Sequence, residues 1–220
     1  MIKGVIFDFN GTLVNDKKAN EAAWYKALMK LSNGQVNFDE FYPRYTSVKD
    51  TILIAAMFDE IKMPYDKEKL DEYAEFKEEE YRKTILEMGV TKLRAGAEDV
   101  FRYLKKNGIS FNMATSSIKN NVDFYFATYG LDAYFDRNLV VYDDGNYTDK
   151  VRMYKDAAKR IGVPIEECIV FEDSMKSLKE AIQAGCKKVV GVAMDNHPEI
   201  IEIRQQISDY QELDYTIFEE

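Results

Sequence analysis

Three short clusters of polar residues follow apolar stretches of the chain and contain the residue types that bind phosphate and Mg²⁺. They are Asp8-Phe9-Asn10-Gly11-Thr12, Thr115-Ser116-Ser117 and Glu172-Asp173-Ser174. Carboxylates are hard anionic ligands for Mg²⁺, and hydroxyls with backbone amides at a helix start hold phosphate. The clusters therefore predict a site in which Asp8 and Asp173 bind Mg²⁺ and Thr115 or Ser116 holds a phosphate group.

The elements that would bring these clusters together alternate along the chain. Apolar runs typical of buried strands occupy residues 5–7, 109–114, 139–141, 168–171 and 188–192, and helical patterns occupy residues 96–106, 119–129, 151–161 and 174–184. Such alternation predicts right-handed crossovers and a parallel sheet with helices on both faces, which is a doubly wound α/β fold. Because the carboxyl ends of parallel strands lie along one edge, we expect the three clusters to face one ligand.

Residues 15–88 have a different character from the rest of the chain. They are rich in Ala, Leu, Glu, Lys and Met, with Trp24, Leu28 and Leu31 at helical spacing, and strand patterns resume only afterwards. We therefore expect an all-helical cap at residues 15–89, inserted into a core domain formed by residues 1–14 and 90–220. Such a cap is expected to move and to gate the entry of substrate and water.

Composition argues against several classes of protein. Of the 220 residues, 46% are hydrophobic and 31% are charged, which is typical of a folded globular protein. The net charge of −9, without a run of Lys and Arg, argues against nucleic-acid binding. No segment reaches the roughly 18 apolar residues of a membrane span and the N-terminus lacks a signal peptide, so we expect a cytoplasmic protein without membrane contacts. We expect a monomer or a weak dimer.

The cysteines and the single histidine are not expected to do chemistry. Cys168 and Cys186 each lie beside apolar residues, which favours reduced core packing over a disulfide or a metal site. His197 precedes Pro198 at a helix-start pattern and is more typical of a surface cap than of a catalytic base.

The ordered set of motifs resembles a known family, the haloacid dehalogenase (HAD) superfamily, and within it the branch of β-phosphoglucomutase and phosphoglycolate phosphatase, which has a helical cap after the first strand. The resemblance spans nearly the whole chain. The matching segments are residues 5–13, the pair Ala23-Trp24, residues 114–117, residues 169–174 and the pair Ala184-Gly185.

The resemblance implies a role for each matching residue. Asp8 would attack phosphorus and form an aspartyl phosphate, and Thr115 or Ser116, with Ser117 beside them, would bind the phosphate. Mg²⁺ would be bound by Asp8, the backbone carbonyl of Asn10, Glu172 and Asp173. The family also has a lysine that offsets charge at the nucleophile; an ungapped match places Thr148 there. We choose Lys150, two residues later, because its long side chain reaches across a turn; the alternative is a solvated Lys150 at a helix start.

Asn10 is the largest departure from the family pattern. Most phosphatases of the superfamily have a second aspartate here, which protonates the leaving alcohol and then activates water. An amide does neither, and general acid and base catalysis is typically worth about 10²- to 10⁴-fold, so we expect slower hydrolysis of ordinary phosphomonoesters. Replacing Asn10 by Asp is expected to restore that factor.

The leading interpretation is an Mg²⁺-dependent phosphohydrolase that acts on a small phosphorylated metabolite through Asp8, attenuated by Asn10. Two alternatives remain. Phosphonatases of the superfamily lack this carboxylate and use a cap lysine as a Schiff base, a placement similar to that of Lys49, although such a lysine must be buried. The other alternative is a non-catalytic phosphate-binding regulatory protein. Arg44 and Lys49 in the cap are expected to bind the anionic substrate.

Overall fold

A computed structural model describes residues 2–45, 48–194 and 200–219 of the chain; His197 lies outside the described residues. The chain forms two compact units: Met1–Asn15 together with Thr91–Glu220, and Asp16–Val90. The first unit contains the sheet and the second is a helical insert. Within the described part of the chain, no helix is both long enough and apolar enough to cross a membrane.

The first unit is built on a six-stranded parallel sheet in the order β3-β2-β1-β4-β5-β6. This is the doubly wound α/β fold that the sequence predicts, and the strand order reverses between β1 and β4, where such sheets bind ligands. The strands are β1 (Gly4–Phe7), β2 (Ser110–Ile118), β3 (Val141–Asp143), β4 (Cys168–Glu172), β5 (Lys188–Val192) and β6 (Ile203–Ile207).

Three details of the sheet differ from the sequence prediction. Strand β2 does not stop at Ala114 but continues to Ile118, and its register with β3 shifts between these two residues. Strand β3 begins at Val141 instead of residue 139. Strand β6 was not predicted, because its sequence Ile-Arg-Gln-Gln-Ile lacks an apolar run. It lies at the sheet edge and pairs with β5 alone, so it needs no fully apolar surface.

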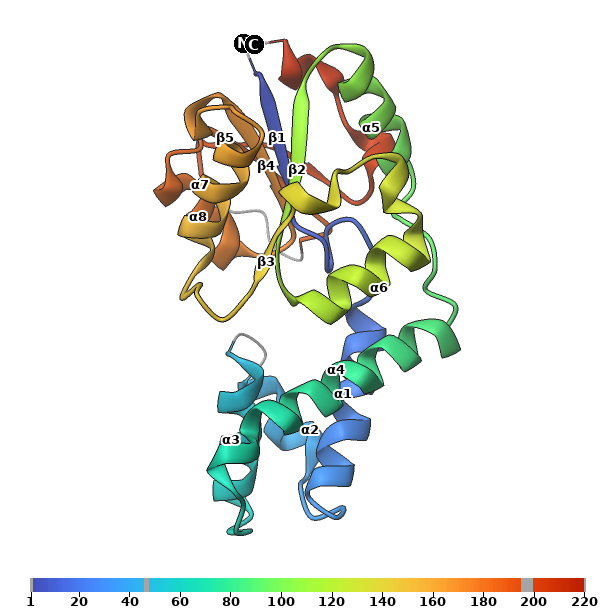
Figure 1. Cartoon of the computed structure of the whole chain (residues 1–220), viewed down its shortest axis with the longest axis vertical. Helices are drawn as coiled ribbons and strands as arrows, with labels where there is room; N and C mark the ends of the chain where they lie inside the picture. The colour runs from blue at the N-terminus through green and yellow to red at the C-terminus, as the bar shows by residue number, and fades with distance from the viewer. Residues whose placement is uncertain (1, 46–47, 195–199, 220) are drawn as a thin grey trace. The chain divides into compact units, whose positions relative to one another are not determined.

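The two faces of the sheet have different cores. Ile6 and Val170 belong to an aliphatic cluster under α7 (Lys150–Arg160) and α8 (Met175–Ala184). Phe7 instead contacts Phe101 of α5 (Ala97–Lys106), at a centroid distance of 5.3 Å. Figure 1 draws α7 and α8 on one side of the strands and α5 on the other. Every residue of β1 is buried, so the strand that ends before Asp8 is fixed from both faces.

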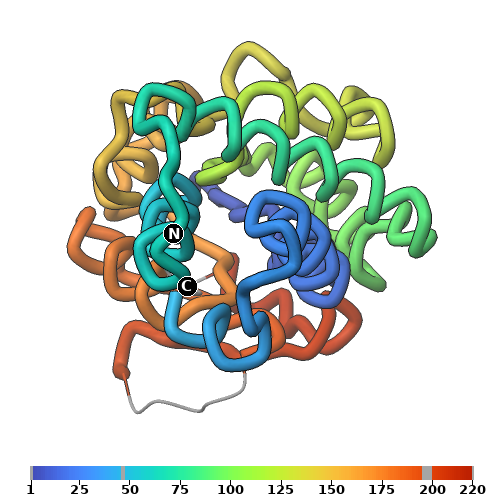
Figure 2. The backbone as a smooth tube through the Cα atoms, turned by 90° about the horizontal axis from the view of Figure 1, so that it is seen from below, coloured from blue at the N-terminus to red at the C-terminus, as the bar shows by residue number. Residues whose placement is uncertain are grey.

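The second unit contains helices and, among its described residues 16–45 and 48–90, no strand. The helices are α1 (Lys17–Leu31), α2 (Phe38–Phe41), α3 (Asp50–Glu60) and α4 (Leu70–Glu87). Helices α1 and α4 pack side by side, as the blue and blue-green coils of Figure 2 show. Trp24, Leu28 and Met57 belong to its buried core. At the start of the unit, Tyr81 of α4 donates a hydrogen bond to Asp16, at 2.6 Å.

The chain enters α5 through Gly96, which has a left-handed backbone conformation with φ of 82°. A Cβ atom at Gly96 would lie 2.7 Å from the backbone N of Gln211 and 2.7 Å from the carbonyl carbon of Tyr210. Two backbone segments therefore meet here at a distance that only glycine allows. Gly108 at the other end of α5 also has a positive φ, of 69°, but a Cβ there would meet nothing within 4 Å.

We predict that Gly96→Ala lowers the free energy of unfolding by about 2–4 kcal/mol, since alanine adds overpacking to the cost of the left-handed conformation. Gly108→Ala carries only the conformational cost and should lower it by about 1 kcal/mol. Urea unfolding followed by circular dichroism measures both changes. Equal losses in the two variants would contradict the close packing inferred at Gly96.

Candidate active site

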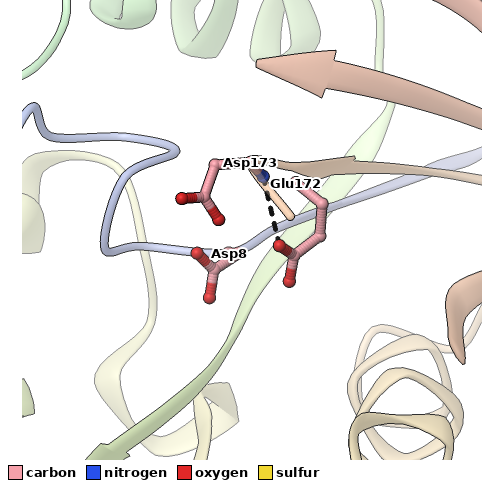
Figure 3. Close-up of side chains that lie close together, drawn as sticks. All are labelled: Asp8, Glu172 and Asp173. Carbon is pink, nitrogen blue, oxygen red and sulfur yellow. Dashed lines mark hydrogen bonds between the residues drawn. The ribbon is translucent and has the colours of Figure 1, made fainter. Parts of the chain in front are cut away.

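Asp8, Glu172 and Asp173 lie together at the carboxyl ends of β1 and β4 (Figure 3). Phe7 pairs in register with Phe171, so the next residue of each strand, Asp8 and Glu172, reach the same sheet edge. The backbone N–H of Asp8 donates to the carbonyl of Phe171 at 3.0 Å, which fixes the start of the loop. One carboxylate oxygen from each of the three acids lies within 4.8 Å of the others. The sheet thus gathers three carboxylates from two distant segments of the chain.

The loop after β1 is held against these carboxylates. Gly11 has φ of 74°, and a Cβ there would lie 2.0 Å from Oδ2 of Asp173, so a side chain at residue 11 would displace the Asp173 carboxylate. The hydroxyl of Thr12 donates to Oδ2 of Asp8 at 3.1 Å. Arg94 donates through Nε and Nη2 to the carbonyl of Gly11, at 3.0 and 2.7 Å. These contacts place the backbone of residues 10–11 beside Asp8 and Asp173.

Lys150 supplies the positive charge of the site. Its Nζ donates to Oδ1 of Asp8 at 2.6 Å and to Oε1 of Glu172 at 2.5 Å. Tyr154, one turn along α7, donates its hydroxyl to the same Glu172 oxygen at 2.5 Å. Thr148, where the ungapped match places the family lysine, is exposed and contacts the neighbouring Asp149. The start of α7 therefore brings Lys150, and not Thr148, to Asp8.

The protonation of these groups reflects burial and mutual charge. Asp8 is 4% exposed and Glu172 is 0% exposed. Burial, then repulsion by Glu172, raise the pKa of Asp8 to about 6, although Lys150 acts to lower it. Burial alone would lower the pKa of Lys150, but attraction to Asp8 and Glu172 outweighs it and raises the pKa above its ordinary value of 10.5. Lys150 therefore carries its charge at neutral pH.

Asp8, Glu172 and Asp173 bring three carboxylates together in a mostly buried place, and Lys150 forms ion pairs with two of them. A buried excess of charge is costly unless another charge offsets it. Hard carboxylate and carbonyl oxygens at this spacing are the donors that Mg²⁺ prefers. The three carboxylates of Asp8, Glu172 and Asp173 therefore fit a divalent cation.

The polar residues of β2 lie in different environments. Thr115 is buried and its hydroxyl accepts a hydrogen bond from the backbone N–H of Ser117, at 3.1 Å, whereas Ser116 is exposed. The hydroxyl of Ser117 donates to Oδ1 of Asn10 at 2.8 Å. The amide nitrogen of Asn10 donates to the hydroxyl of Tyr125 on α6 (Lys119–Tyr129) at 3.0 Å. Sequence reasoning missed Tyr125, because its helical pattern indicates burial but not which loop it touches.

Arg44 and Lys49, the two cap residues expected to bind substrate, lie in different environments within the insert unit. Arg44 donates from Nη2 to both carboxylate oxygens of Glu60, at 2.7 Å each, and from Nε to the carbonyl of Glu40. Lys49 is exposed, immediately before α3. Burial is what lowers the pKa of an imine-forming lysine, so the structure gives the phosphonatase alternative no support at Lys49. A substrate contact by Arg44 or by Lys49 stays a prediction.

A different lysine of the insert unit is buried. Lys77 on α4 is 4% exposed, and its Nζ lies 2.9 Å from Glu78, 3.5 Å from Asp50 and 4.7 Å from the ring centre of Trp24. Burial acts to lower the pKa of Lys77, but attraction to Asp50 and Glu78 outweighs it and raises the pKa above 10.5. Lys77 is therefore a charged residue of the cap core and lacks the neutral amine that an imine requires.

A parallel sheet with an acidic site at the β1–β4 switch point and a helical insert after its first strand defines a Rossmann-like hydrolase class. The chain belongs to the haloacid dehalogenase-like hydrolases, whose family model matches residues 2–185. A HAD hydrolase of family IA, variant 3, from Entamoeba histolytica is 30% identical, with a TM-score of 0.86 and coverage of 99% of this chain and 97% of that chain. The resemblance stated from the motifs is thus confirmed.

Two further relatives extend the comparison. The phosphorylated carbohydrates phosphatase of Thermotoga maritima is 23% identical over 87% of this chain and 85% of its own length. A variant of CbbY from Rhodobacter sphaeroides, whose structure contains xylulose-(1,5)bisphosphate, shares the fold with a TM-score of 0.78. It is 22% identical and covers 97% of this chain and 96% of that chain.

We predict that Lys150→Met lowers the free energy of unfolding by about 3 kcal/mol at pH 8 without Mg²⁺, because it leaves two buried carboxylates without a countercharge. Without Lys150 the pKa of Asp8 rises further above about 6. A carboxyl group whose folded-state pKa is raised stabilises the fold at low pH, and this stabilisation is lost as pH rises through that pKa. The destabilisation caused by Lys150→Met should therefore grow from pH 5 to pH 8. Denaturant unfolding in EDTA at both values measures it.

The matched control is Lys155→Met, which removes an exposed lysine from the same helix. It should change the free energy of unfolding by less than about 0.5 kcal/mol at either pH. A pH-independent loss in Lys150→Met would show that the lysine contributes packing and not charge.

Proposed function

We propose that this protein is an Mg²⁺-dependent phosphohydrolase in which Asp8 accepts the phosphoryl group of a small phosphorylated metabolite. The observation that carries the proposal is the position of Asp8, buried at a strand end between Lys150 and Thr12 and beside Glu172 and Asp173. A carboxylate held by fixed partners in a buried place is suited to covalent catalysis. The family membership and the phosphatase relatives agree with this chemistry.

The proposed reaction has two steps. An oxygen of Asp8 attacks phosphorus, the bond to the leaving oxygen breaks, and an aspartyl phosphate forms; water then attacks phosphorus and releases phosphate and Asp8. Lys150 offsets the charge between Asp8 and the phosphoryl oxygens, and Thr115 or Ser116 hold those oxygens. Asp8, Asp173 and the carbonyl of Asn10 would hold Mg²⁺, which supplies positive charge to the transferring group.

The proposed substrate is a small phosphorylated metabolite with a good leaving group. Relatives with the fold include a phosphorylated carbohydrates phosphatase and a protein with bound xylulose-(1,5)bisphosphate. Asn10 cannot protonate a leaving alcohol, so acyl and aryl phosphates should react faster than sugar phosphates. The aspartyl phosphate should accumulate for the same reason, since the attacking water has no base at residue 10.

We predict a burst of nitrophenol from nitrophenyl phosphate, about equal to the amount of enzyme, followed by slow turnover that requires Mg²⁺. Rapid-mixing absorbance measures the burst, and mass spectrometry after acid quenching locates the phosphoryl group on Asp8. Asp8→Asn removes the nucleophile and should abolish both signals. Activity that persists undiminished in Asp8→Asn, or that is unchanged when EDTA removes Mg²⁺, would overturn the proposed function.

The metal site is tested separately from turnover. We predict that Asp173→Asn weakens Mg²⁺ binding at least about tenfold by calorimetry, because it removes an anionic ligand that packs on Gly11. Asp144→Asn makes the same change of charge at an exposed turn and should leave the affinity unchanged. Equal affinities in the two variants would show that Asp173 is not a ligand.

A further inference from the structure

Tyr125 is a buried residue of α6 that contacts the loop after β1, which contains Asp8 and Asn10. Its side chain is 0% exposed, and its ring stacks on that of Phe9 with a centroid distance of 3.9 Å and an interplanar angle of 18°. Phe9 is itself fully buried and lies between Asp8 and Asn10 in the chain. The stacking therefore fixes the phenol hydroxyl beside residue 10, where the family usually has its acid and base.

Three polar side chains form a closed ring of hydrogen bonds at this point. Nδ2 of Asn10 donates to the hydroxyl of Tyr125 at 3.0 Å, and the hydroxyls of Tyr125 and Ser117 lie 2.9 Å apart. The Ser117 hydroxyl donates to Oδ1 of Asn10 at 2.8 Å. The Tyr125 hydroxyl also lies 3.2 Å from Oδ1 of Asn10 as a donor, so each of the three side chains contacts the other two. Hydrogen bonds in such a ring polarise one another and favour a single arrangement.

The ring engages both ends of the Asn10 amide. The nitrogen donates to Tyr125, and the oxygen accepts from Ser117 at 2.8 Å and lies 3.2 Å from the Tyr125 hydroxyl, so the amide cannot turn toward another group without breaking these hydrogen bonds. Each such bond is worth roughly 0.5–1.5 kcal/mol, and the loss is larger where a partner stays buried. Asparagine suits this ring, because its side chain both donates and accepts.

We propose that Tyr125 is a positioning residue which, with Ser117, holds the side chain of residue 10 on β2 and α6 and away from the leaving-group oxygen. The inference rests on the proposed function and deepens it: the site is built for phosphoryl donors whose leaving group departs without a proton, such as acyl and aryl phosphates. Lost acid catalysis then has two causes, the amide of Asn10 and the ring that holds it.

The proposal distinguishes Asn10→Asp from a double variant. A carboxylate at residue 10 can accept a hydrogen bond from both Ser117 and Tyr125, so the ring holds it as it holds the amide. The single variant should therefore gain less than tenfold on alkyl phosphates, below the factor expected from acid and base catalysis alone. Removing the phenol hydroxyl in Asn10→Asp/Tyr125→Phe should release the carboxylate and raise kcat/KM at least another tenfold.

The test measures kcat/KM with saturating Mg²⁺ for a series of phosphates that differ in leaving-group pKa. The slope of log kcat/KM against that pKa should stay steep in Asn10→Asp and become shallow in Asn10→Asp/Tyr125→Phe. Asn10→Asp/Ser117→Ala removes the other hydroxyl and serves as a second variant in case the first folds poorly. Asn10→Asp/Tyr134→Phe is the matched control, since the hydroxyl of Tyr134 contacts Arg102 instead of the ring.

The outcomes separate this inference from the proposed function. A shallow slope in Asn10→Asp alone, or a steep slope in both ring variants, would overturn the role of Tyr125 while phosphatase activity stands. Mg²⁺-dependent activity in the native protein that is no higher than in Asp8→Asn would overturn the proposed function instead. The ring has its own readout, because the side-chain amide resonances of Asn10 should shift in Tyr125→Phe and stay in place in Tyr134→Phe.

Discussion

The contact of Lys150 with Asp8 and Glu172 is the interaction on which the rest of the site depends. One ammonium group is paired with two buried carboxylates, so removal of Lys150 leaves both of them without a countercharge in a buried place. The helix that carries Lys150 also carries Tyr154, whose buried hydroxyl satisfies the same Glu172 oxygen. The first turns of α7 thus set the charge and the hydrogen bonding of the strand ends.

The sheet makes this contact possible through its strand order. Because β1 and β4 are neighbours, Asp8 and Glu172 come side by side although 164 residues separate them in the sequence. The aliphatic face of the sheet holds α7 and α8, and the aromatic face holds α5, so β1 cannot shift under the charges at its end. Burial of the strand from both faces therefore fixes the start of the charge-rich loop that follows it.

The parts of this protein that sequence predicted are those with a local pattern. Apolar runs followed by Asp8 and by Glu172 and Asp173 located the strand ends, and the alternation of strands with helices fixed the fold class. The choice of Lys150 rested on the length of its side chain, because an ungapped match to the family places Thr148 at the position of the family lysine. Strand β6 has a polar sequence, which is tolerated because the strand lies at the edge of the sheet. Without an apolar run, it has no sequence pattern that predicts a strand. Tyr125 lies 115 residues from Asn10, and only the packing of α6 on β2 brings them together.

The two halves of the site differ in how far they depart from the family pattern. Formation of the aspartyl phosphate needs a nucleophile, countercharge and cation ligands, and all of these groups are present around Asp8. Protonation of the leaving oxygen and activation of water need an acid and base at residue 10, where an amide is held by two hydroxyls. In the proposed mechanism, such a site accepts a phosphoryl group from a donor with a good leaving group more readily than it releases that group to water. Retention of the phosphoryl group on Asp8 is therefore the property that, on the proposed mechanism, would distinguish this site from one with a carboxylate at residue 10.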